Sequence, residues 1–323
     1  MTTQTPKLPI GTVGLGLMGS SIATCILAAG HPVMSLVKEL SQANEARDRI
    51  LGFLHQLQDE GLLTELPETV LNRLTITDDV TLLRDYEVVI ESIIENIEEK
   101  KSVYHRLETV LAPTAIIGSN TSAIPVTVLQ NGLKHPERVL GIHWAEPAHI
   151  TRFMEVICGN ESDIQYAKQV VALAESWGKE PSLLRKDIRG FITNRIMYAM
   201  LREAFHLVEN GYATIEDVDR SLRNDLGYWI TFAGPFRFMD LTGIPAYLTV
   251  MNDLFPELSN ATQTPKLMEE LVAAGAKGVQ NAQGFYPYTP ESAQHWEEQF
   301  INFSYDIRKL AQRYSSTSAN DSK

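Results

Sequence analysis

The feature that most constrains the fold is a glycine-rich turn between a predicted strand and a predicted helix near the N-terminus. The stretch GTVGLGLMGSSIATCILAAG contains Gly14, Gly16 and Gly19 in the spacing G-x-G-x-x-G. In this pattern the first glycine permits a tight turn, the second lets a pyrophosphate approach the backbone, and the third allows close helix–strand packing. The helix N-terminus then offers N–H donors to phosphate oxygens. The turn predicts a dinucleotide-binding unit, and a turn without a nucleotide is the less favoured alternative.

Short apolar runs alternate with longer helical patterns from Leu8 to about Lys186. We expect strands over 10–13, 32–37, 74–76, 87–92, 115–119, 139–144, 153–158 and 182–185. We expect helices between them over 17–29, 42–57, 68–73, 97–110 and 162–177. This alternation predicts an α/β domain with a Rossmann-type, mostly parallel sheet and helices on both faces.

The pattern changes after Asp187. Apolar residues recur at helical spacing through RGFITNRIMYAMLREAFHLVENG, and Thr214 is the expected N-cap of the following helix. No convincing strand follows. We therefore predict a dinucleotide-binding domain over residues 1–186 and an all-helical domain for substrate binding and dimerisation over residues 187–323.

Composition and charge exclude several kinds of partner. A net charge of −12 and a pI near 5.2 argue against nucleic acid or an anionic membrane. No apolar run approaches the roughly 18 residues of a membrane span, and the N-terminal stretch lacks the pattern of a signal peptide. Cys25 and Cys158 lie in or beside apolar segments, so we expect buried free thiols in a reducing cytoplasm. The polar tail after Tyr314 is expected to be disordered.

One histidine and one glutamate lie in apolar segments twelve residues apart. His143 ends the predicted strand VLGIHW, at the edge where open α/β sheets bind ligands. A histidine there can accept a hydroxyl proton while a hydride leaves the same carbon. Glu155 lies in the next predicted strand and could hold the imidazole in one tautomer. Taken alone, a histidine in an apolar run is more often a core residue, so its role as a base depends on the other motifs.

Two further polar motifs are candidates for substrate contacts. Ser122 follows a predicted strand in GSNTSAIPV, and Asn194 lies in the first turns of the apolar helix GFITNRIM, where an amide needs partners. Each could instead be a local turn or cap residue. His143, His149 and Glu146 do not share a spacing that suits a metal ion, so we expect no metal site.

The end of the second predicted strand leaves the choice of cofactor open. Val37 and Lys38 stand where an acid usually bonds the adenosine ribose of NAD. Lys38 could favour the 2′-phosphate of NADP, because a repulsive charge is removed and a counter-charge is gained. Alternatively, Lys38 is a solvated loop residue, and Glu39 or the backbone binds the ribose of NAD.

Together these residues resemble the 3-hydroxyacyl-CoA dehydrogenase family over most of the chain. The shared motifs, in order, are VGLGLMGSSIA, IIENIEEK, SNTSAIPVT, GIHW…P…MEVI, RGFITNRI…EAFHLVENG, EDVD, AGPFRFMDLTG and QGFYPY. Several spaced motifs in one order are more specific than any single motif.

The resemblance implies an NAD(P)-dependent enzyme of fatty acid metabolism that reversibly oxidises an L-3-hydroxyl to a 3-ketone, and a homodimer formed through the helical domain. It implies that His143 is the catalytic base and Glu155 its partner, with Ser122 and Asn194 bonding the substrate oxygen. The predicted cofactor-binding residues are Gly14, Gly16, Leu17, Met18, Gly19, Lys38, Glu95, Lys100 and Asn120.

The chain departs from the family pattern in three places. Val37 replaces the usual acid, and Glu146 replaces the amide of H-x-x-N-P. The segment Glu39–Asp79 has nine acids, three arginines and no lysine, whereas CoA-binding members carry a lysine-rich helical pair there. This acidic surface would repel the 3′-phosphate of CoA.

The substrate is therefore open between an acyl-CoA and a small free hydroxy or keto acid. LQDEGLLTELPE and the C-terminus after Tyr288 are similar to gulonate and carnitine dehydrogenases, whereas SNTSAIPVT and GFYPY are closer to the acyl-CoA branch. A non-catalytic, crystallin-like role is a further alternative, which the joint presence of the candidate catalytic residues disfavours. A 3-hydroxyisobutyrate or 6-phosphogluconate type dehydrogenase is excluded, because the long helix lacks the catalytic lysine of those enzymes.

Overall fold

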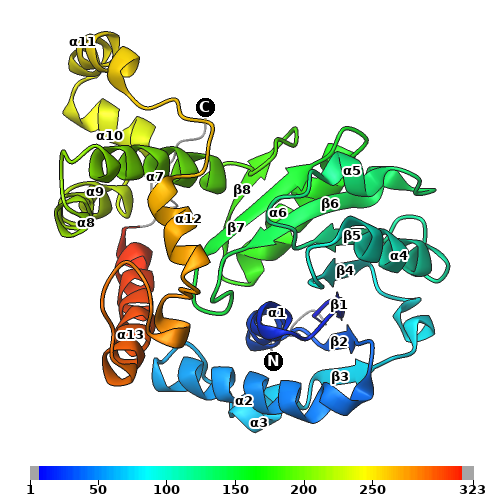
Figure 1. The fold of residues 1–323 in the computed structure, drawn as a ribbon. Coiled ribbons are helices and arrows are strands. Elements are labelled where there is room, and N and C mark those ends of the chain that lie inside the picture. The colour runs from blue at the N-terminus through cyan, green and yellow to red at the C-terminus, as the bar shows by residue number, and fades with distance from the viewer. Residues whose placement is uncertain (1–6, 315–323) are drawn as a thin grey trace. The chain divides into compact units, whose positions relative to one another are not determined.

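The computed structural model describes residues 7–314, so the tail expected to be disordered lies outside the described residues. Contacts within the chain divide it into two compact units, Met1–Thr193 and Asn194–Lys323 (Figure 1). The predicted domain boundary after residue 186 stays a prediction.

The first unit is built around one eight-stranded sheet of order β3-β2-β1-β4-β5-β6-β7-β8. Its neighbouring strands are parallel, except that β6 and β7 are antiparallel. The predicted Rossmann-type, mostly parallel sheet is therefore confirmed. The strand order reverses between β1 and β4, which creates the crevice where open α/β sheets bind their ligands. The strands are β1 Ile10–Val13, β2 Val33–Leu36, β3 Leu74–Thr77, β4 Val88–Glu91, β5 Ile116–Ser119, β6 Val139–Trp144, β7 Phe153–Cys158 and β8 Glu180–Leu184.

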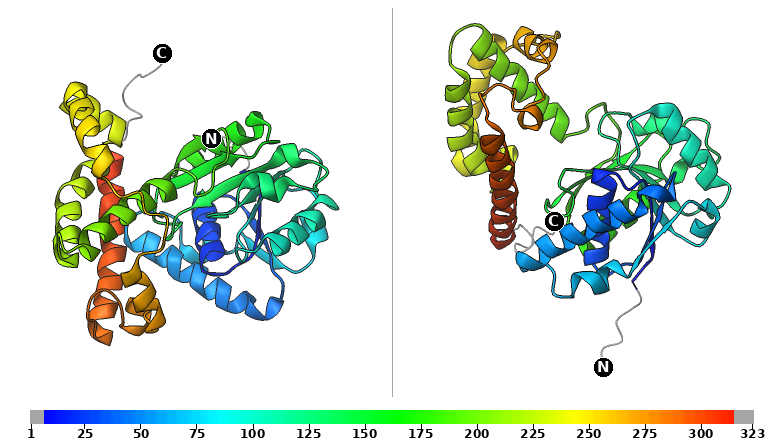
Figure 2. Two further views of the ribbon diagram at one scale, coloured as in Figure 1. Left: turned by 45° about the horizontal axis from the view of Figure 1, so that its top comes forward. Right: turned by 60° about the horizontal axis from the view of Figure 1, so that its bottom comes forward.

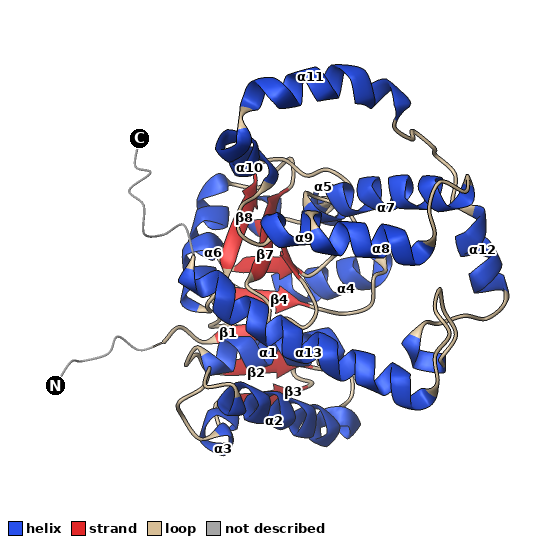
Figure 3. Cartoon of the chain, turned by 90° about the vertical axis from the view of Figure 1, so that its left-hand side faces the viewer, coloured by secondary structure: helices blue, strands red, loops and turns tan. Residues whose placement is uncertain are grey.

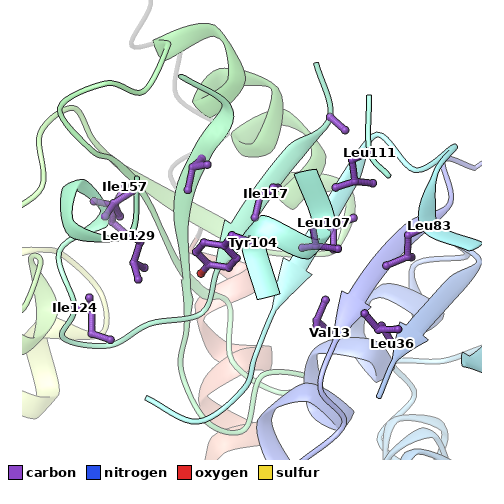
Figure 4. Close-up of a cluster of buried hydrophobic side chains, with 14 of the residues drawn as sticks. Val13, Leu36, Leu83, Tyr104, Leu107, Leu111, Ile117, Ile124, Leu129 and Ile157 are labelled. Atoms are coloured by element: carbon purple, nitrogen blue, oxygen red, sulfur yellow. The ribbon is translucent and has the colours of Figure 1, made fainter. Parts of the chain in front are cut away.

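Helices cover both faces of this sheet. The helices of the first unit are α1 Leu17–Ala28, α2 Ala43–Asp59, α3 Pro67–Leu71, α4 Ile97–Glu108, α5 Val126–Gln130 and α6 Ile164–Ser176. Helix α1 packs with α2 and α3, and α4 packs with α5. Figure 4 shows Tyr104 and Leu107 of α4 close to Ile117 of β5, within one buried apolar cluster. Removal of this apolar surface from water is the main favourable term in folding the unit.

Helix α5 was not expected from the sequence. It is only five residues long, VTVLQ, and begins after Pro125. A helix this short shows no helical periodicity, and two of its residues are β-branched valines that favour strands.

The second unit consists of helices, loops and short turns. Its helices are α7 Thr193–Glu209, α8 Ile215–Asn224, α9 Leu226–Ile230, α10 Pro235–Thr242, α11 Ile244–Leu254, α12 Lys266–Ala273 and α13 Pro290–Arg313, where α7 takes its first residue from the first unit. Thr214 caps α8, as predicted, by accepting a hydrogen bond from the N–H of Asp217 at 3.1 Å. Two isolated bridges join Gly278 to Gln283 and Gln283 to Pro287. Figure 2 and Figure 3 show helices and loops in this unit, which confirms the prediction of a helical domain.

The two cysteines have the environment predicted for them. Cys25 and Cys158 are free and buried, and burial raises the pKa of the Cys158 thiol. Between residues 7 and 314, no helix combines the length and apolar character needed to cross a membrane.

Candidate active site

The glycine turn closes the carboxyl end of β1 at the crevice. Gly14 has φ of 91°, and a Cβ there would lie 2.6 Å from the carbonyl oxygen of Ser92, so glycine is required. A Cβ on Gly19 would overlap the carbonyl oxygen of Gly14, so only glycine lets α1 pack this closely on the turn. A Cβ on Gly16 would meet no described atom within 4 Å, so this side of the turn is open to a ligand.

The start of α1 provides donors for an anion at this open side. No side chain in the described part of the chain caps α1 at Gly16. The N–H groups of the first turn, which includes Leu17 and Met18, therefore have no partner within the helix and suit the oxygens of a pyrophosphate. Arg49 of α2 donates to the carbonyl of Leu15 at 3.2 Å and so helps to hold the turn in place.

His143 and Glu155 lie opposite each other on β6 and β7. They are register partners of the antiparallel pair, and His143 Nδ1 lies 2.8 Å from Glu155 Oε2. The two side chains are only 8% and 1% exposed. Because a carboxylate can only accept, Nδ1 carries the shared hydrogen, and Nε2 is the nitrogen available for proton exchange with a ligand.

The other oxygen of Glu155 is also bonded. Oε1 accepts from the main-chain N–H groups of Ile192 at 3.1 Å and Thr193 at 3.0 Å. Burial by itself would raise the pKa of Glu155, but the hydrogen bond from His143 and these two N–H groups outweigh it and lower the pKa. Glu155 is therefore a carboxylate at neutral pH and can stabilise a protonated His143.

Two aromatic rings pack against the imidazole of His143 and limit its movement. The ring centroids of Phe153 and Phe191 each lie 5.5 Å from that of His143, with Phe153 edge-on at 90°. Phe191 has φ of 50°, a left-handed conformation that is rare for a large side chain. This conformation immediately precedes the two N–H groups that bond Glu155, so the local backbone and the acid are held together.

Asn120 joins the carboxyl ends of three strands. Its Nδ2 donates to Ser92 Oγ at 3.1 Å, and its Oδ1 accepts from the N–H of Trp144 at 3.0 Å. Its own N–H donates to the carbonyl of Glu91 at 2.8 Å. Asn120 thus fixes the backbone next to His143, and its predicted contact with the cofactor stays a prediction.

Glu95 organises the loop after β5. Its Oε1 accepts from Thr121 Oγ1 at 2.6 Å and from the N–H groups of Ser122 at 3.0 Å and Ala123 at 3.1 Å. Burial alone would raise the pKa of Glu95, but the bond from Thr121 and the charge of Lys100 lower it. Ser122 itself is exposed at the carboxyl edge of the sheet, where a substrate would lie.

Lys100 has no exposed side-chain surface. Its Nζ lies 2.7 Å from Glu91 Oε1 and 3.4 Å from Glu95 Oε2. Lys100 thus bridges Glu91 and Glu95, and its predicted contact with the cofactor stays a prediction.

The acidic segment Glu39–Asp79 offers no unoccupied arginine to a phosphate. Each of its three arginines is bonded within the first unit, and these bonds are Arg47 to the carbonyl of Leu74 at 3.2 Å, Arg49 to Glu45 at 2.6 Å, and Arg73 to Glu65 at 3.0 Å. The nine acids of the segment are therefore not offset by free cations.

Two family models match most of the chain. The model described as 3-hydroxyacyl-CoA dehydrogenase, NAD binding domain, matches residues 9–188, and the C-terminal domain of the same family matches residues 190–288. The chain belongs to the 3-hydroxyacyl-CoA dehydrogenase family. It is an NAD-dependent oxidoreductase, and the crevice at the glycine turn fits the cofactor. The non-catalytic alternative is thereby set aside.

Relatives in the family act on different substrates. The chain is 33% identical to the 5-formyl-3-hydroxy-2-methylpyridine 4-carboxylate 5-dehydrogenase of Mesorhizobium japonicum, over 87% of this chain and 91% of that protein. It is 32% identical to a probable 3-hydroxybutyryl-CoA dehydrogenase of Deinococcus radiodurans, over 87% of this chain and all of that protein.

Solved structures show the same two kinds of relative. A crystal structure of 5-formyl-3-hydroxy-2-methylpyridine 4-carboxylic acid 5-dehydrogenase, described as an NAD+ dependent dismutase, matches with a TM-score of 0.87 and 31% identity over 95% of this chain and 99% of that chain. The (S)-3-hydroxybutyryl-CoA dehydrogenase of Ralstonia eutropha matches with a TM-score of 0.73 and 28% identity over 87% of this chain and 99% of that chain.

Lys38 and Asn194 are the remaining residues predicted to contact the cofactor or the substrate. The N–H of Val37 donates to the carbonyl of Thr77 at 2.8 Å as the chain leaves β2, and Lys38 after it is exposed. With NAD as the cofactor, a phosphate clamp by Lys38 stays a prediction. Asn194 opens the second unit, so its approach to the substrate also stays a prediction. Over the described residues, no group of three or more His, Cys, Asp or Glu side chains could hold a metal ion.

Two residues that shape this site were not among those predicted from the sequence. Glu91 is a single acid inside the apolar run VVIE, and that pattern could have marked it. Phe191 carried no such signal, because its backbone conformation and its contact with His143 appear only in the folded chain.

Proposed function

We propose that this protein reversibly oxidises a hydroxyl-bearing carbon of a small substrate to a carbonyl, with His143 as general acid–base and Glu155 as its partner. The observation that supports this most is the 2.8 Å bond between His143 Nδ1 and Glu155 Oε2 at the carboxyl edge of an NAD-binding sheet. Ser122, at the same edge, is the proposed hydrogen-bond partner of the substrate oxygen.

The proton transfer follows from the two nitrogens of His143. During oxidation Nε2 accepts the hydroxyl proton, while the C–H hydrogen leaves the same carbon as a hydride. Bound NAD supplies the hydride acceptor. The imidazolium that forms is stabilised by the buried negative charge of Glu155, and Nδ1 keeps its hydrogen throughout. In the reverse direction Nε2 returns the proton to the carbonyl oxygen.

We propose a small free acid as the substrate in preference to a CoA thioester. The segment Glu39–Asp79 carries nine acids, no lysine and three arginines that are already bonded, so its charge disfavours the phosphates of CoA. The similarity to a dehydrogenase named for a pyridine carboxylate supports the same choice. An L-3-hydroxyacyl-CoA is the second candidate, supported by SNTSAIPVT, GFYPY and the 3-hydroxybutyryl-CoA dehydrogenase relatives.

A turnover panel tests both parts of this proposal. Acetoacetyl-CoA, free 3-keto acids, aromatic and sugar acids are each assayed with NAD or NADH, with His143→Gln as the matched variant. We expect turnover of a free acid, and a loss of roughly 10²–10⁴-fold in the variant, which is the usual contribution of a positioned base. Faster turnover of the CoA thioester would refute the free-acid substrate, and unchanged turnover in the variant would refute the base.

We also propose a cytoplasmic homodimer formed through the second unit. Its surface exposes large apolar side chains, among them Tyr228 at 82%, Phe236 at 79% and Phe303 at 61% exposure. Large apolar side chains exposed together on one unit suit an interface between protein chains. The buried free thiols of Cys25 and Cys158 suit a reducing compartment. Light scattering should give twice the 36.1 kDa chain mass, and a mass of one chain would refute the dimer.

A further inference from the structure

A buried carboxylate that the proposed mechanism does not use lies beside the dinucleotide crevice. Glu91 is the last residue of β4, and its register partners are Val13 at the end of β1 and Ser119 at the end of β5. Its side chain has no exposed surface. Glu91 therefore lies between the strand that leads into the glycine turn and the strand that leads into the loop of Ser122.

Glu91 accepts four hydrogen bonds. Oε1 accepts from Lys100 Nζ at 2.7 Å and from the N–H of Ile93 at 2.7 Å. Oε2 accepts from the Tyr104 hydroxyl at 2.6 Å and from Ser119 Oγ at 2.9 Å. Burial raises the pKa of Tyr104 well above its ordinary value, so this phenol keeps its hydrogen and donates it. Two donors on each oxygen are the partners that an ionised carboxylate requires.

The charges around Glu91 do not cancel. Among residues 7–314, Lys100 is the single cation in contact with both Glu91 and Glu95, at 2.7 Å and 3.4 Å. Two carboxylates and one ammonium leave one negative charge in excess. At the same edge of the sheet, the charge of Glu155 is already directed at His143. The excess charge of the Glu91–Lys100–Glu95 cluster is therefore a separate feature of the site.

We propose that this excess charge makes Glu91 a specificity residue that favours NAD+ over NADH. The inference rests on the proposed function, in which the reacting end of the cofactor lies at this edge. The nicotinamide ring of NAD+ carries a positive charge and that of NADH does not, so a nearby negative charge stabilises only the oxidised form. Removing one such charge changes the ratio of the two affinities roughly two- to fivefold.

Calorimetric titration with NAD+ and with NADH, in the wild type and four variants, tests whether the charge of Glu91 favours NAD+. Glu91→Gln removes a negative charge, so the ratio Kd(NAD+)/Kd(NADH) should rise about two- to fivefold. Lys100→Met removes the positive charge, so the ratio should fall by a similar factor. Tyr104→Phe and Ser119→Ala each remove one hydrogen bond to Glu91 without changing the charge. These matched controls should keep the wild-type ratio even where they lower the melting temperature.

A purely structural role of Glu91 would give a different pattern. If both charge variants shift the ratio in the same direction, or if the neutral controls shift it as much, the inference is overturned. Should Glu91→Gln not fold by circular dichroism, Glu95→Gln removes the same charge from a side chain that is 41% exposed, and it must raise the ratio. An unchanged ratio with normal nucleotide binding refutes this inference alone. A wild type that binds neither nucleotide refutes the proposed function.

Discussion

Replacing Glu155 by glutamine separates the two roles of this acid, which are to orient His143 and to bind the main chain of Ile192 and Thr193. In the wild type, Oε2 accepts from His143 Nδ1 and Oε1 accepts from the N–H groups of Ile192 and Thr193. The carboxamide oxygen of Glu155→Gln can still accept from both N–H groups, which leaves its NH₂ group facing His143. Because that group only donates, Nδ1 must become an acceptor, and the single imidazole hydrogen moves to Nε2. Nε2 then cannot accept the substrate proton.

The expected loss of activity has two causes. His143 is held in the wrong tautomer, and the negative charge of Glu155 that stabilises the imidazolium is removed. We expect kcat to fall by roughly 10²–10⁴-fold, or about 3–5 kcal/mol of transition-state stabilisation. The free energy of unfolding should fall by only about 1–2 kcal/mol, since the two main-chain bonds remain. Glu155→Ala is the matched control. It leaves both N–H groups without the carboxylate, so it should be the less stable variant, yet it adds no donor against Nδ1.

The two variants therefore reverse their order between two assays. Steady-state NADH absorbance should show glutamine less active than alanine, whereas urea unfolding should show alanine less stable than glutamine. Calorimetry should show NAD affinity within about threefold of wild type in both, as expected if Glu155 acts through His143 alone. If Glu155→Gln keeps wild-type turnover, or is more active than Glu155→Ala, the tautomer argument fails.

Other changes give equally direct outcomes. Gly16→Ala should weaken NAD binding at least about tenfold, because the added Cβ would occupy space that the pyrophosphate needs. The melting temperature should change little, since this Cβ meets no described atom, and an unchanged NAD affinity would contradict the prediction. Gly19→Ala should lower the free energy of unfolding by about 2–4 kcal/mol, because its Cβ would overlap the carbonyl of Gly14; wild-type stability in urea would contradict this. Lys38→Ala should reduce NADP affinity more than NAD affinity if Lys38 can bind a 2′-phosphate, and equal effects on both would remove that idea. The pKa of Glu155 is lowered in the folded state, so its ionisation stabilises the fold at a pH above its ordinary pKa of 4.5, and this contribution is lost as the pH falls through the lowered pKa. Glu155→Gln should therefore lose less stability than wild type on acidification, as measured by urea unfolding, and an equal loss in both would contradict this.

Much of the first unit follows from local sequence. The glycine turn, the buried runs and the helical spacing between them each have one physical interpretation, so all eight predicted strands are present. The short helix α5 was missed, because five residues do not complete enough turns to show a helical period.

The site was predictable only in part. The pairing of His143 with Glu155 could be expected, since one short return between neighbouring strands brings their ends together. The burial of Lys100 could not, because an ENIEEK motif does not reveal that Glu91, nine residues earlier, draws the ammonium inward. The strand-end bonds of Asn120 and the left-handed Phe191 likewise depend on contacts between segments far apart in the sequence.

The most direct test of the account is a crystal structure with NAD and an unreactive analogue of whichever substrate the turnover panel identifies. The measured quantity is the distance from His143 Nε2 to the reacting oxygen of that analogue. We predict hydrogen-bond distance, about 2.6–3.2 Å, with the Nδ1 bond to Glu155 retained. A reacting oxygen bound to another side chain, with the imidazole separated from it by packed residues, would contradict the central claim.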